Sequence, residues 1–259
     1  MSKVNEYRQI LEKLDDWDNY LRAESGLPGP RGNLELAHAV ADLADRERCE
    51  HFLSFDPERA PVNTPDEFLA FCGIESLGRL ITEGQTDLWP TLRACASDPR
   101  WRAREGVAMA LQRVGRANME ALLDQMETWA TGTWLEMRAV AAGLAEPALL
   151  QEERHILHAL TLLDQITAAI KNAGERGDPG LSRKNATQRD GDFKVLRQGM
   201  GYCWSVVVAA LPAQGKQSME CWFSSADKDV RWIMKENLKK KRLERMDKDW
   251  VSLWKSKMS

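Results

Sequence analysis

The chain has 259 residues, of which 36 are basic and 39 acidic, and its net charge is −3. This charge is not that of a strongly cationic nucleic-acid binder, although basic residues can still gather on one face. No apolar run reaches the ~18 residues that a membrane span needs, and residues 1–9 lack the apolar region of a signal peptide.

The cysteines indicate a reducing compartment. There are five of them, an odd number, and they are widely spaced in apolar stretches with helical periodicity. We therefore expect reduced thiols in the core, as in cytosolic proteins. A cytoplasmic protein with no membrane partner is the expectation.

Residues 1–85 are predicted to form an N-terminal helical region made of a divergent repeat and a cap. Apolar residues three and four apart over 3–24 predict one helix of about six turns. A Gly- and Pro-rich loop follows, and a second helix is expected over 33–53, beginning at a favourable capping asparagine. The run Thr-Pro-Asp-Glu predicts the start of a third helix over 64–82.

A sequence repeat lies between residues 98 and 150. The segment DPRWRAREGVAMALQRVG is followed 33 positions later by GTWLEMRAVAAGLAEPALL, so that Trp101 aligns with Trp134 and Leu111 with Leu144. Each copy has the 3.6-residue period of an amphipathic helix, and a second amphipathic segment precedes each copy. The repeating unit is therefore a helical hairpin.

A projection at 100° per residue divides each helix of the repeat into two faces. Trp101 and Trp134 fall on the apolar face, which we expect to be buried. The opposite face is expected to form a concave binding surface. Its candidate residues are Arg102, Glu105, Met109, Arg113, Arg116 and, from the second copy, Arg138. Glu105 and Arg138 share one azimuth, so they could also pair between successive copies.

Hairpins of this size bury their apolar faces by stacking on one another. A period near 33 also fits ankyrin and tetratricopeptide arrays, but their signature motifs do not occur at matching places. The pattern of Asp98, Trp101 and Arg102, found again as Asp227, Val230 and Arg231, resembles the HEAT repeat. We expect an all-α, right-handed solenoid without a sheet. We expect its repeats to span residues 86–245 and a capping tail to span 246–259, both as parts of one continuous domain.

The chain is rich in tryptophan, with 10 of these residues. Tryptophan fills gaps between stacked hairpins, and the helical spacing of several of them indicates core positions. Those assigned to the core are Trp89, Trp101, Trp129, Trp134 and Trp204. The remaining ones could line a groove.

A long loop is predicted at residues 174–192, after a helix over 152–172. The segment GERGDPGLSRKNATQRDGD is rich in glycine and charge, and loops of more than about 12 to 15 residues are uncommon inside compact domains. It is either a tolerated insertion, since long loops cost little closure entropy, or a contact loop for phosphate or a partner. In the second case Arg183, Lys184, Arg189 and Lys194 would make the contacts.

Basic charge collects near the C-terminus. A helix is predicted over 193–211, followed by a hairpin whose second helix spans 227–243. This hairpin ends in a cluster able to attract phosphates, which would otherwise be a solvated helix end that suits the helix dipole. The cluster consists of Lys239, Lys240, Lys241, Arg242 and Arg245. An apolar stripe then follows, interpreted as a cap or a docking helix, formed by Met246, Trp250 and Trp254.

No catalytic constellation is visible. A glycine-rich phosphate loop, a nucleophile elbow and a CxxC pair are all missing from the sequence. Glu152 and His155 form a single E-x-x-H with His158 one turn later, whereas di-metal bundles need two such motifs and more carboxylates. We interpret these histidines as surface residues and assign no catalytic residue, metal or cofactor.

Three segments of the chain are WRAREGVAMALQRVG, EPALL and DKDVRWIMKENLKKKRL. Together they resemble a group of bacterial HEAT-repeat proteins and, more distantly, the HEAT-like alkylpurine DNA glycosylases. The second resemblance implies a basic groove that holds a DNA backbone, with aromatics and one acidic residue beside the lesion. No W-x-x-x-D segment is found on the helix expected to carry that acid, and Trp101 followed by Glu105 is the nearest substitute.

Two functions follow as expectations. The first is a non-catalytic scaffold that binds a protein or peptide partner on its concave face. The alternative is a DNA-binding or DNA-repair protein that uses the same groove and the basic C-terminal cluster. The overall acidity favours the first.

Overall fold

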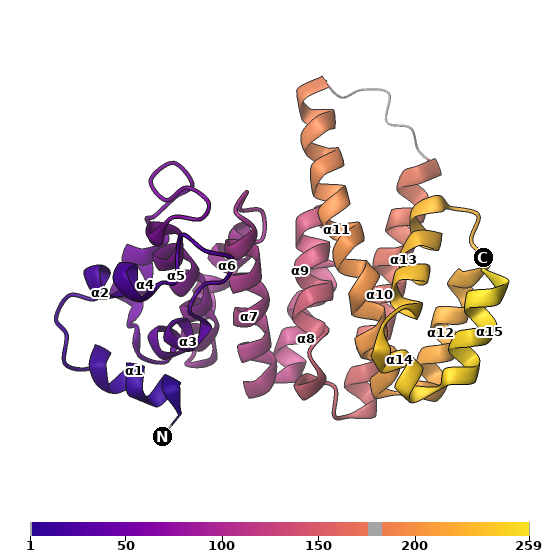
Figure 1. Ribbon diagram of the computed structural model, residues 1–259, viewed down its shortest axis with the longest axis horizontal. Helices are drawn as coiled ribbons and strands as arrows, with labels where there is room; N and C mark the ends of the chain where they lie inside the picture. Colours follow the sequence, from indigo (N-terminus) through magenta and orange to yellow (C-terminus); the bar gives the residue numbers. More distant parts are fainter. Residues whose placement is uncertain (1, 176–182, 259) are drawn as a thin grey trace. The chain divides into compact units, whose positions relative to one another are not determined.

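The computed structural model describes residues 2–175 and 183–258, and within these ranges it is helical with no strand (Figure 1). The side chains described are those of 2–173 and 191–258. The all-α class is therefore confirmed. No helix in the described part is both long and apolar enough to cross a membrane.

The chain divides into two compact units, residues 1–118 and 119–259, which are described separately. The two copies of the sequence repeat belong to different units, so their stacking stays a prediction. The predicted domain limits at residues 85 and 245 stay predictions as well.

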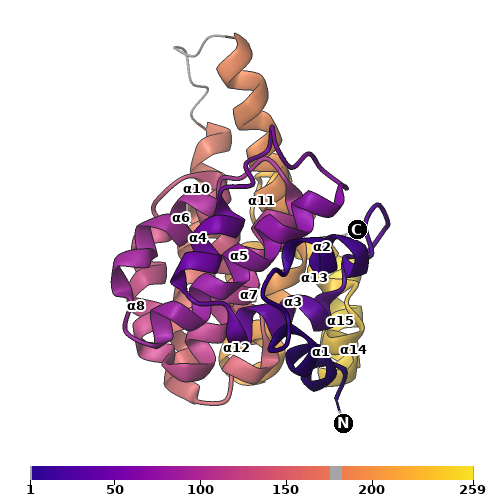
Figure 2. The same cartoon turned by 90° about the vertical axis from the view of Figure 1, so that its left-hand side faces the viewer.

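The described residues of unit 1 form seven α-helices and a short 3-10 turn at Thr86–Leu88. Figures 1 and 2 label the α-helices. The α-helices are α1 (Lys3–Leu11), α2 (Asp18–Glu24), α3 (Leu34–Leu43), α4 (Arg46–Leu53), α5 (Pro65–Thr82), α6 (Trp89–Cys95) and α7 (Trp101–Ala117).

The single helix predicted over 3–24 is wrong, because the chain breaks between α1 and α2. The indole Nε1 of Trp17 donates to the carbonyl of Leu11 at 2.9 Å and to that of Leu14 at 3.1 Å. The ring is 5 % exposed and folds back over the end of α1. The Asp16 carboxylate then accepts the amide of Asp18 at 2.9 Å, which starts α2.

The helix predicted over 33–53 is likewise two helices, α3 and α4. Its predicted start is confirmed, since the Asn33 side chain accepts the amide of Leu36 at 3.1 Å. The break comes at Asp45, which has an extended backbone and accepts the amide of Arg48 at 2.9 Å. A residue of this kind is a helix N-cap, and apolar periodicity alone does not register it.

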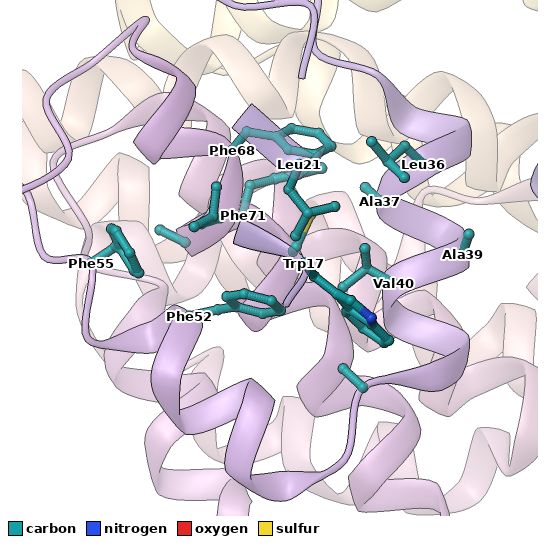
Figure 3. Packing of buried hydrophobic residues seen from close by; sticks show 14 of the residues in the cluster. Trp17, Leu21, Leu36, Ala37, Ala39, Val40, Phe52, Phe55, Phe68 and Phe71 are labelled. Atoms are coloured by element: carbon teal, nitrogen blue, oxygen red, sulfur yellow. The ribbon is translucent and has the colours of Figure 1, made fainter. Parts of the chain in front are cut away.

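Helix α5 is the centre of unit 1, and its predicted bounds are confirmed. Thr64 caps it, Pro65 stands in its first turn, and every residue from Glu67 to Ile81 except Arg79 is buried. It contacts α2, α3, α4, α6 and α7. Helix α7 comes so close that a Cβ on Gly78 would lie 2.5 Å from the carbonyl oxygen of Ala110, so glycine permits this crossing. The aromatic core beside α5 is drawn in Figure 3 and includes Trp17, Phe52, Phe55, Phe68 and Phe71.

Unit 2 is organised around the long helix α11. Its described helices are α8 (Met119–Trp129), α9 (Trp134–Leu144), α10 (Glu153–Glu175), α11 (Arg183–Ala210), α12 (Pro212–Phe223), α13 (Lys228–Leu238), α14 (Lys241–Met246) and α15 (Lys248–Lys257), with a 3-10 turn at Pro147–Leu149. Helix α11 contacts α9, α10, α12, α13 and α14 (Figure 1).

The loop predicted over 174–192 is wrong for most of its length. Helix α10 continues to Glu175 and α11 already begins at Arg183, while residues 176–182 lie outside the described residues. The segment 183–192 has no apolar face, but lysine, arginine, glutamine and alanine are good helix formers. A polar helix carries no hydrophobic periodicity, so the pattern predicted a loop.

The helix predicted over 227–243 ends at Leu238, and α14 begins at Lys241. The tail that follows packs on α12. The indoles of Trp250 and Trp254 both donate to the Glu220 carboxylate, at 2.6 and 3.3 Å, and the Trp254 ring lies 4.4 Å from that of Phe223. The apolar stripe of the tail therefore lies against a helix of its own unit.

Candidate functional site

The first two residues of α7 lie opposite to their projected faces. Trp101 is 46 % exposed, whereas Arg102 is 6 % exposed. The projection was therefore wrong by one position at the start of the helix. The reason is that Arg102 has found a buried partner, which a projection of one helix cannot include.

That partner is Glu67, in the first turn of α5. Arg102 Nη1 donates to Glu67 Oε2 at 2.9 Å, and the Glu67 side chain is 1 % exposed. Two buried charges are tolerated only when they are paired and hydrogen-bonded. Breaking this pair by removing one partner would leave the other charge buried and uncompensated.

The same arginine joins two loops. Arg102 Nη2 donates to the carbonyl of Gly29 at 2.7 Å and to Asn63 Oδ1 at 3.3 Å. The backbone N–H of Asn63 in turn donates to Glu67 Oε2 at 2.7 Å. Asn63 has a left-handed backbone, with φ of 66°, a conformation that asparagine tolerates better than most residues. The buried pair thus holds the 25–33 loop against α5 and α7.

A pocket of about 240 Å³ lies beside this pair, between the 25–33 loop, α5 and α7. Its lining is almost entirely apolar apart from charged groups at Arg31, Arg102 and Glu105. The lining residues are Arg31, Gly32, Leu34, Phe68, Phe71, Trp101, Arg102, Glu105 and Met109. The exposed Trp101 ring also lies over the Arg102 guanidinium, with 4.4 Å between the ring centroid and Cζ.

The predicted concave residues do not all come together. Arg102, Glu105 and Met109 line the pocket, but Arg113 has other partners. Arg113 Nη1 donates to Asp42 Oδ1 at 2.6 Å, and its Nη2 lies 3.7 Å from Glu75 Oε1. Arg116 is exposed, and Arg138 belongs to unit 2. Whether any of them binds a partner stays a prediction.

Around Glu75 lies a cluster of charged groups from three helices. His38 Nδ1 of α3 lies 2.5 Å from Glu75 Oε1 of α5, and this hydrogen bond raises the pKa of His38 above its ordinary value. Desolvation and the charges of Arg113 and Arg116 oppose the rise. The second carboxylate oxygen of Glu75 is buried and has no hydrogen-bond partner among the described residues.

The basic C-terminal cluster lies on unit 2, at the end of α13 and along α14. Arg242 donates a hydrogen bond to the Tyr202 hydroxyl, and its guanidinium lies 4.8 Å from the centroid of that ring. Tyr202 is 44 % exposed. On the same helix α11, Arg197 lies 4.2 Å from the Trp232 ring centroid and pairs with Asp229 at 2.7 Å. Two arginine–aromatic pairs therefore involve residues of α11.

Three cations of the cluster have neither an ion pair nor a side-chain hydrogen bond with any residue that the structure describes. They are Lys240, Lys241 and Arg245. Lys239, in contrast, pairs with Glu236. The other predicted basic residues, Arg183, Lys184 and Arg189, stand in the first part of α11, and their side chains lie outside the described residues.

The histidines of the E-x-x-H motif are engaged with carboxylates rather than with each other. His155 Nε2 lies 3.3 Å from Glu120 Oε1, and His158 Nε2 lies 3.0 Å from Glu127 Oε1. His155 is 7 % exposed, so its assignment to the surface was wrong. Within the described residues, no group of three or more His, Cys, Asp or Glu side chains could hold a metal ion.

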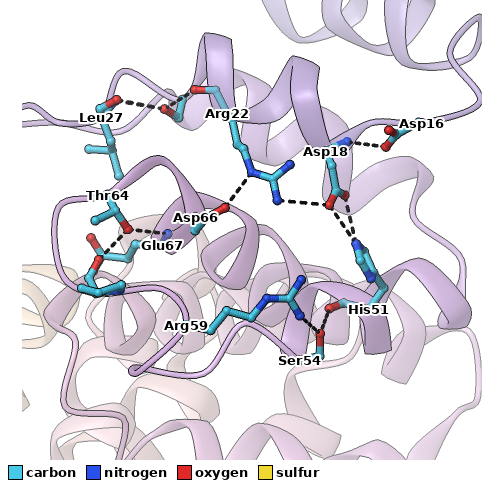
Figure 4. A network of polar contacts seen from close by, with 12 residues as sticks. Asp16, Asp18, Arg22, Leu27, His51, Ser54, Arg59, Thr64, Asp66 and Glu67 are labelled. Atoms are coloured by element: carbon cyan, nitrogen blue, oxygen red, sulfur yellow. Dashed lines mark hydrogen bonds and ion pairs between the residues drawn. The ribbon is translucent and has the colours of Figure 1, made fainter.

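A larger hollow of about 360 Å³ lies between the connection from α1 to α2 and the helix α4 with its capping residue Asp45, and it is lined mainly by acidic residues. Three of its five acidic residues, Asp16, Asp18 and Asp45, accept hydrogen bonds within the protein. Figure 4 shows Asp18 contacting His51 through both oxygens at 3.0 Å and pairing with Arg22, which also pairs with Asp66 at 2.6 Å. These contacts tie α2, α4 and α5 together.

The thiols fit the predicted core positions except one. Cys49, Cys72 and Cys203 are buried, Cys95 is partly buried and Cys221 is exposed. Burial raises the pKa of Cys49 and of Cys95 to about 12. The thiols at these two positions are therefore protonated at neutral pH and unreactive.

Several residues of the pocket were not identified from the sequence. Phe68 and Phe71 stand three apart on a helix that is rich in apolar residues. Hydrophobic periodicity therefore did not distinguish a pocket wall from the core. Leu34 and Arg31 reach the pocket only through the path of the 25–33 loop.

Comparison with models of protein families, curated proteins and solved structures finds no match to this chain. What it binds must be inferred from its own geometry.

Proposed function

We propose that the chain is a non-catalytic helical scaffold that binds a protein or peptide partner, and that the pocket of unit 1 receives one apolar side chain of that partner. One observation carries this proposal: Trp101 is 46 % exposed at the edge of an apolar pocket. Tryptophan is the residue most enriched among those that dominate binding energy at interfaces.

The size of the pocket favours a single side chain over a metabolite. Sites for small molecules and cofactors commonly enclose ~300–1,000 Å³, and this pocket has about 240 Å³. A leucine, methionine or phenylalanine side chain placed there would contact Phe68, Phe71 and Met109. Burying such a side chain contributes about 1.5–3 kcal/mol.

We further infer a right-handed solenoid of stacked hairpins that resemble HEAT repeats as the architecture of this scaffold. The support is that α6 contacts α7, α8 contacts α9 and α12 contacts α13, each pair joined by a short connection. Arrays of this kind bind partners along an extended surface, which suits an anchor pocket at one point of it.

The test uses peptides selected from a random display library on the wild-type protein. We expect them to share an apolar anchor residue, and we expect Trp101→Ala to weaken their binding about tenfold or more, as for a hot-spot residue. Tyr202→Ala in unit 2 is the matched control, because Tyr202 is 44 % exposed but does not line the pocket. Equal binding by both variants would overturn the proposal.

A second candidate is nucleic-acid binding by unit 2. The observation that favours it is two arginine–aromatic pairs, Arg197 with Trp232 and Arg242 with Tyr202, in the unit that also carries three cations without partners among the described residues. Single strands bind to surfaces that combine positive charge with aromatic rings on which bases stack. A DNA-repair role would add the pocket of unit 1, where Trp101 and Glu105 stand four apart.

Fluorescence anisotropy with a 20-nucleotide single strand and with a duplex distinguishes the two functions. A nucleic-acid binder should lose affinity steeply between 50 and 200 mM salt, by about 0.7–0.9 log units per log unit of salt for each phosphate contact. Reversing the charges of Lys240, Lys241 and Arg245 should abolish that binding. Reversing Lys3 and Lys13, exposed lysines of unit 1, should not.

A further inference from the structure

We propose that the pocket of unit 1 takes the C-terminal residue of a partner chain, with an apolar side chain in the hollow and the terminal carboxylate on Arg31. This inference rests on the proposed function and names the part of the partner that is bound.

Arg31 supplies the charge for this recognition. It lines the pocket, it is exposed, and it has no ion pair or hydrogen bond with any residue that the structure describes. Its loop is fixed, because the Gly29 carbonyl accepts from Arg102 at 2.7 Å and the backbone N–H of Asn33 donates to the Ser25 carbonyl at 2.9 Å. An arginine on a fixed loop at the rim of an apolar pocket suits a carboxylate, whose two oxygens match the guanidinium fork.

Arg102 also lines the pocket, but its charge is already paired inside the protein. It is 6 % exposed, Nη1 donates to Glu67, and Nη2 donates to the Gly29 carbonyl. Arg102 Nε and Glu67 Oε1 are both buried without a hydrogen-bond partner among the described residues, so this pair favours neither sign of ligand. Arg31 is therefore the cation of the lining that a ligand can reach.

The remaining charged residue of the lining is Glu105, and it does not make the pocket favour a cationic ligand. Glu105 faces the pocket but already takes part in an interaction within the protein. A cationic ligand would also have to approach Arg31. The charge left for a ligand is positive, so an anionic group is favoured.

The terminal carboxylate is favoured over an acidic side chain because of reach. Arg31 and the apolar walls belong to one pocket of about 240 Å³, so the anion must lie within a few bonds of the apolar group. In a C-terminal residue the carboxylate and the side chain share one Cα. An aspartate at the next position stands a further ~3.8 Å along the chain.

The experiment is an NMR titration of the full-length, 15N-labelled protein with two peptides that differ at one group. They are Ac-Gly-Gly-Phe with a free carboxylate and the same peptide as its amide. Trp101→Phe identifies the indole signal of Trp101. We expect both peptides to shift this signal and the free acid to bind about three- to tenfold more tightly, as for one charge-assisted hydrogen bond or ion pair.

Arg31→Gln should remove the advantage of the acid and leave the affinity of the amide unchanged, whereas Trp101→Ala should weaken both. Far-UV circular dichroism checks that both variants fold. Equal binding of acid and amide to the wild type would overturn this inference while the proposed function stands. Tighter binding of Ac-Gly-Phe-Asp-amide than of the free acid would also overturn it. A Trp101 signal that neither peptide shifts would count against both proposals.

Discussion

The two copies of the sequence repeat place different chemistry at one buried position. Arg102 in unit 1 and Leu135 in unit 2 both follow the repeated tryptophan, and they are 6 % and 5 % exposed. The leucine needs only apolar neighbours. The arginine needs Glu67 and the carbonyl of Gly29, and both come from outside its helix. A repeat thus fixes which position faces inward, but not what that position requires.

This difference has a consequence for binding. Because Arg102 reaches out of α7 to a loop and to α5, it draws the 25–33 loop toward Trp101 and forms one side of the pocket. The aligned leucine makes no such hydrogen bonds. The position that departs from the repeat is therefore the one next to the candidate site.

The largest expected effect tests whether Arg102 and Leu135 are equivalent. Arg102→Leu should destabilise the protein by about 3–5 kcal/mol, because it leaves the Glu67 charge buried without its partner. Arg102→Leu combined with Glu67→Leu should recover most of that loss, since apolar replacement of a whole buried pair is often neutral. Urea unfolding measures both.

Arg116→Leu is the control, because Arg116 is an exposed arginine of the same helix. It should change the free energy of unfolding by no more than about 0.5 kcal/mol. A single Arg102→Leu variant as stable as the wild type would mean that the pair does not hold the loop.

The next effect concerns unit 2, where the neutral side-chain amide of Asn237 links two helices, as the Arg102–Glu67 ion pair does in unit 1. Asn237 is fully buried, accepts the Ser205 amide at 2.8 Å and donates to the Met200 carbonyl at 2.8 Å, so it joins α13 to α11. Asn237→Leu should destabilise unit 2 by about 1–3 kcal/mol, the cost of buried polar groups left without partners. Asn172→Leu, at an exposed position of α10, is the control. Thermal unfolding showing equal losses would contradict the bridging role.

A smaller effect is the pH dependence of stability, which we expect from His38 in unit 1. The hydrogen bond to Glu75 raises the pKa of His38, against the opposing charges of Arg113 and Arg116. A raised pKa in the folded state gives stability that is complete below the ordinary histidine value of about 6.5 and is lost as pH rises through the folded value. The wild type should therefore lose more stability between pH 6 and 9 than His38→Gln.

An NMR titration of the His38 ring gives the independent check. A midpoint at or below the ordinary histidine value would show that the Glu75 contact does not favour the charged ring. Buried Asn237 has no group that titrates, so the equivalent link in unit 2 should not respond over this range.

The parts of the fold that the sequence predicted are those set by local signals. The start of α5 at Thr64 and Pro65 and the cap at Asn33 depend on neighbouring residues, and both are confirmed. The break at Trp17 depends on an indole that folds back over six residues, and the burial of Arg102 depends on a glutamate 35 positions away. Periodicity within one helix contains neither contact.

The candidate site was predicted only in part for the same reason. Glu105 and Met109 stand on the expected face of α7, while Arg31 and Leu34 reach the pocket from a loop whose path no sequence pattern describes. Trp101 was assigned to the core because tryptophan at helical spacing is usually buried there. Its exposure follows from the guanidinium that occupies the inward position instead.

The smallest expected effect compares the two repeated tryptophans. Trp101 is 46 % exposed, and Trp101→Ala should cost about 1 kcal/mol or less, chiefly its contact with the Arg102 guanidinium. Trp134 is partly buried and meets Phe193 edge to face, with 5.4 Å between ring centroids. Because an aromatic pair adds about 0.5–1.5 kcal/mol to the burial of its area, Trp134→Ala should cost more. The difference between the two variants in chemical unfolding measures how far the copies have diverged. If Trp101→Ala were the more damaging, its ring would be holding the fold together, and exposure at the pocket would no longer indicate binding.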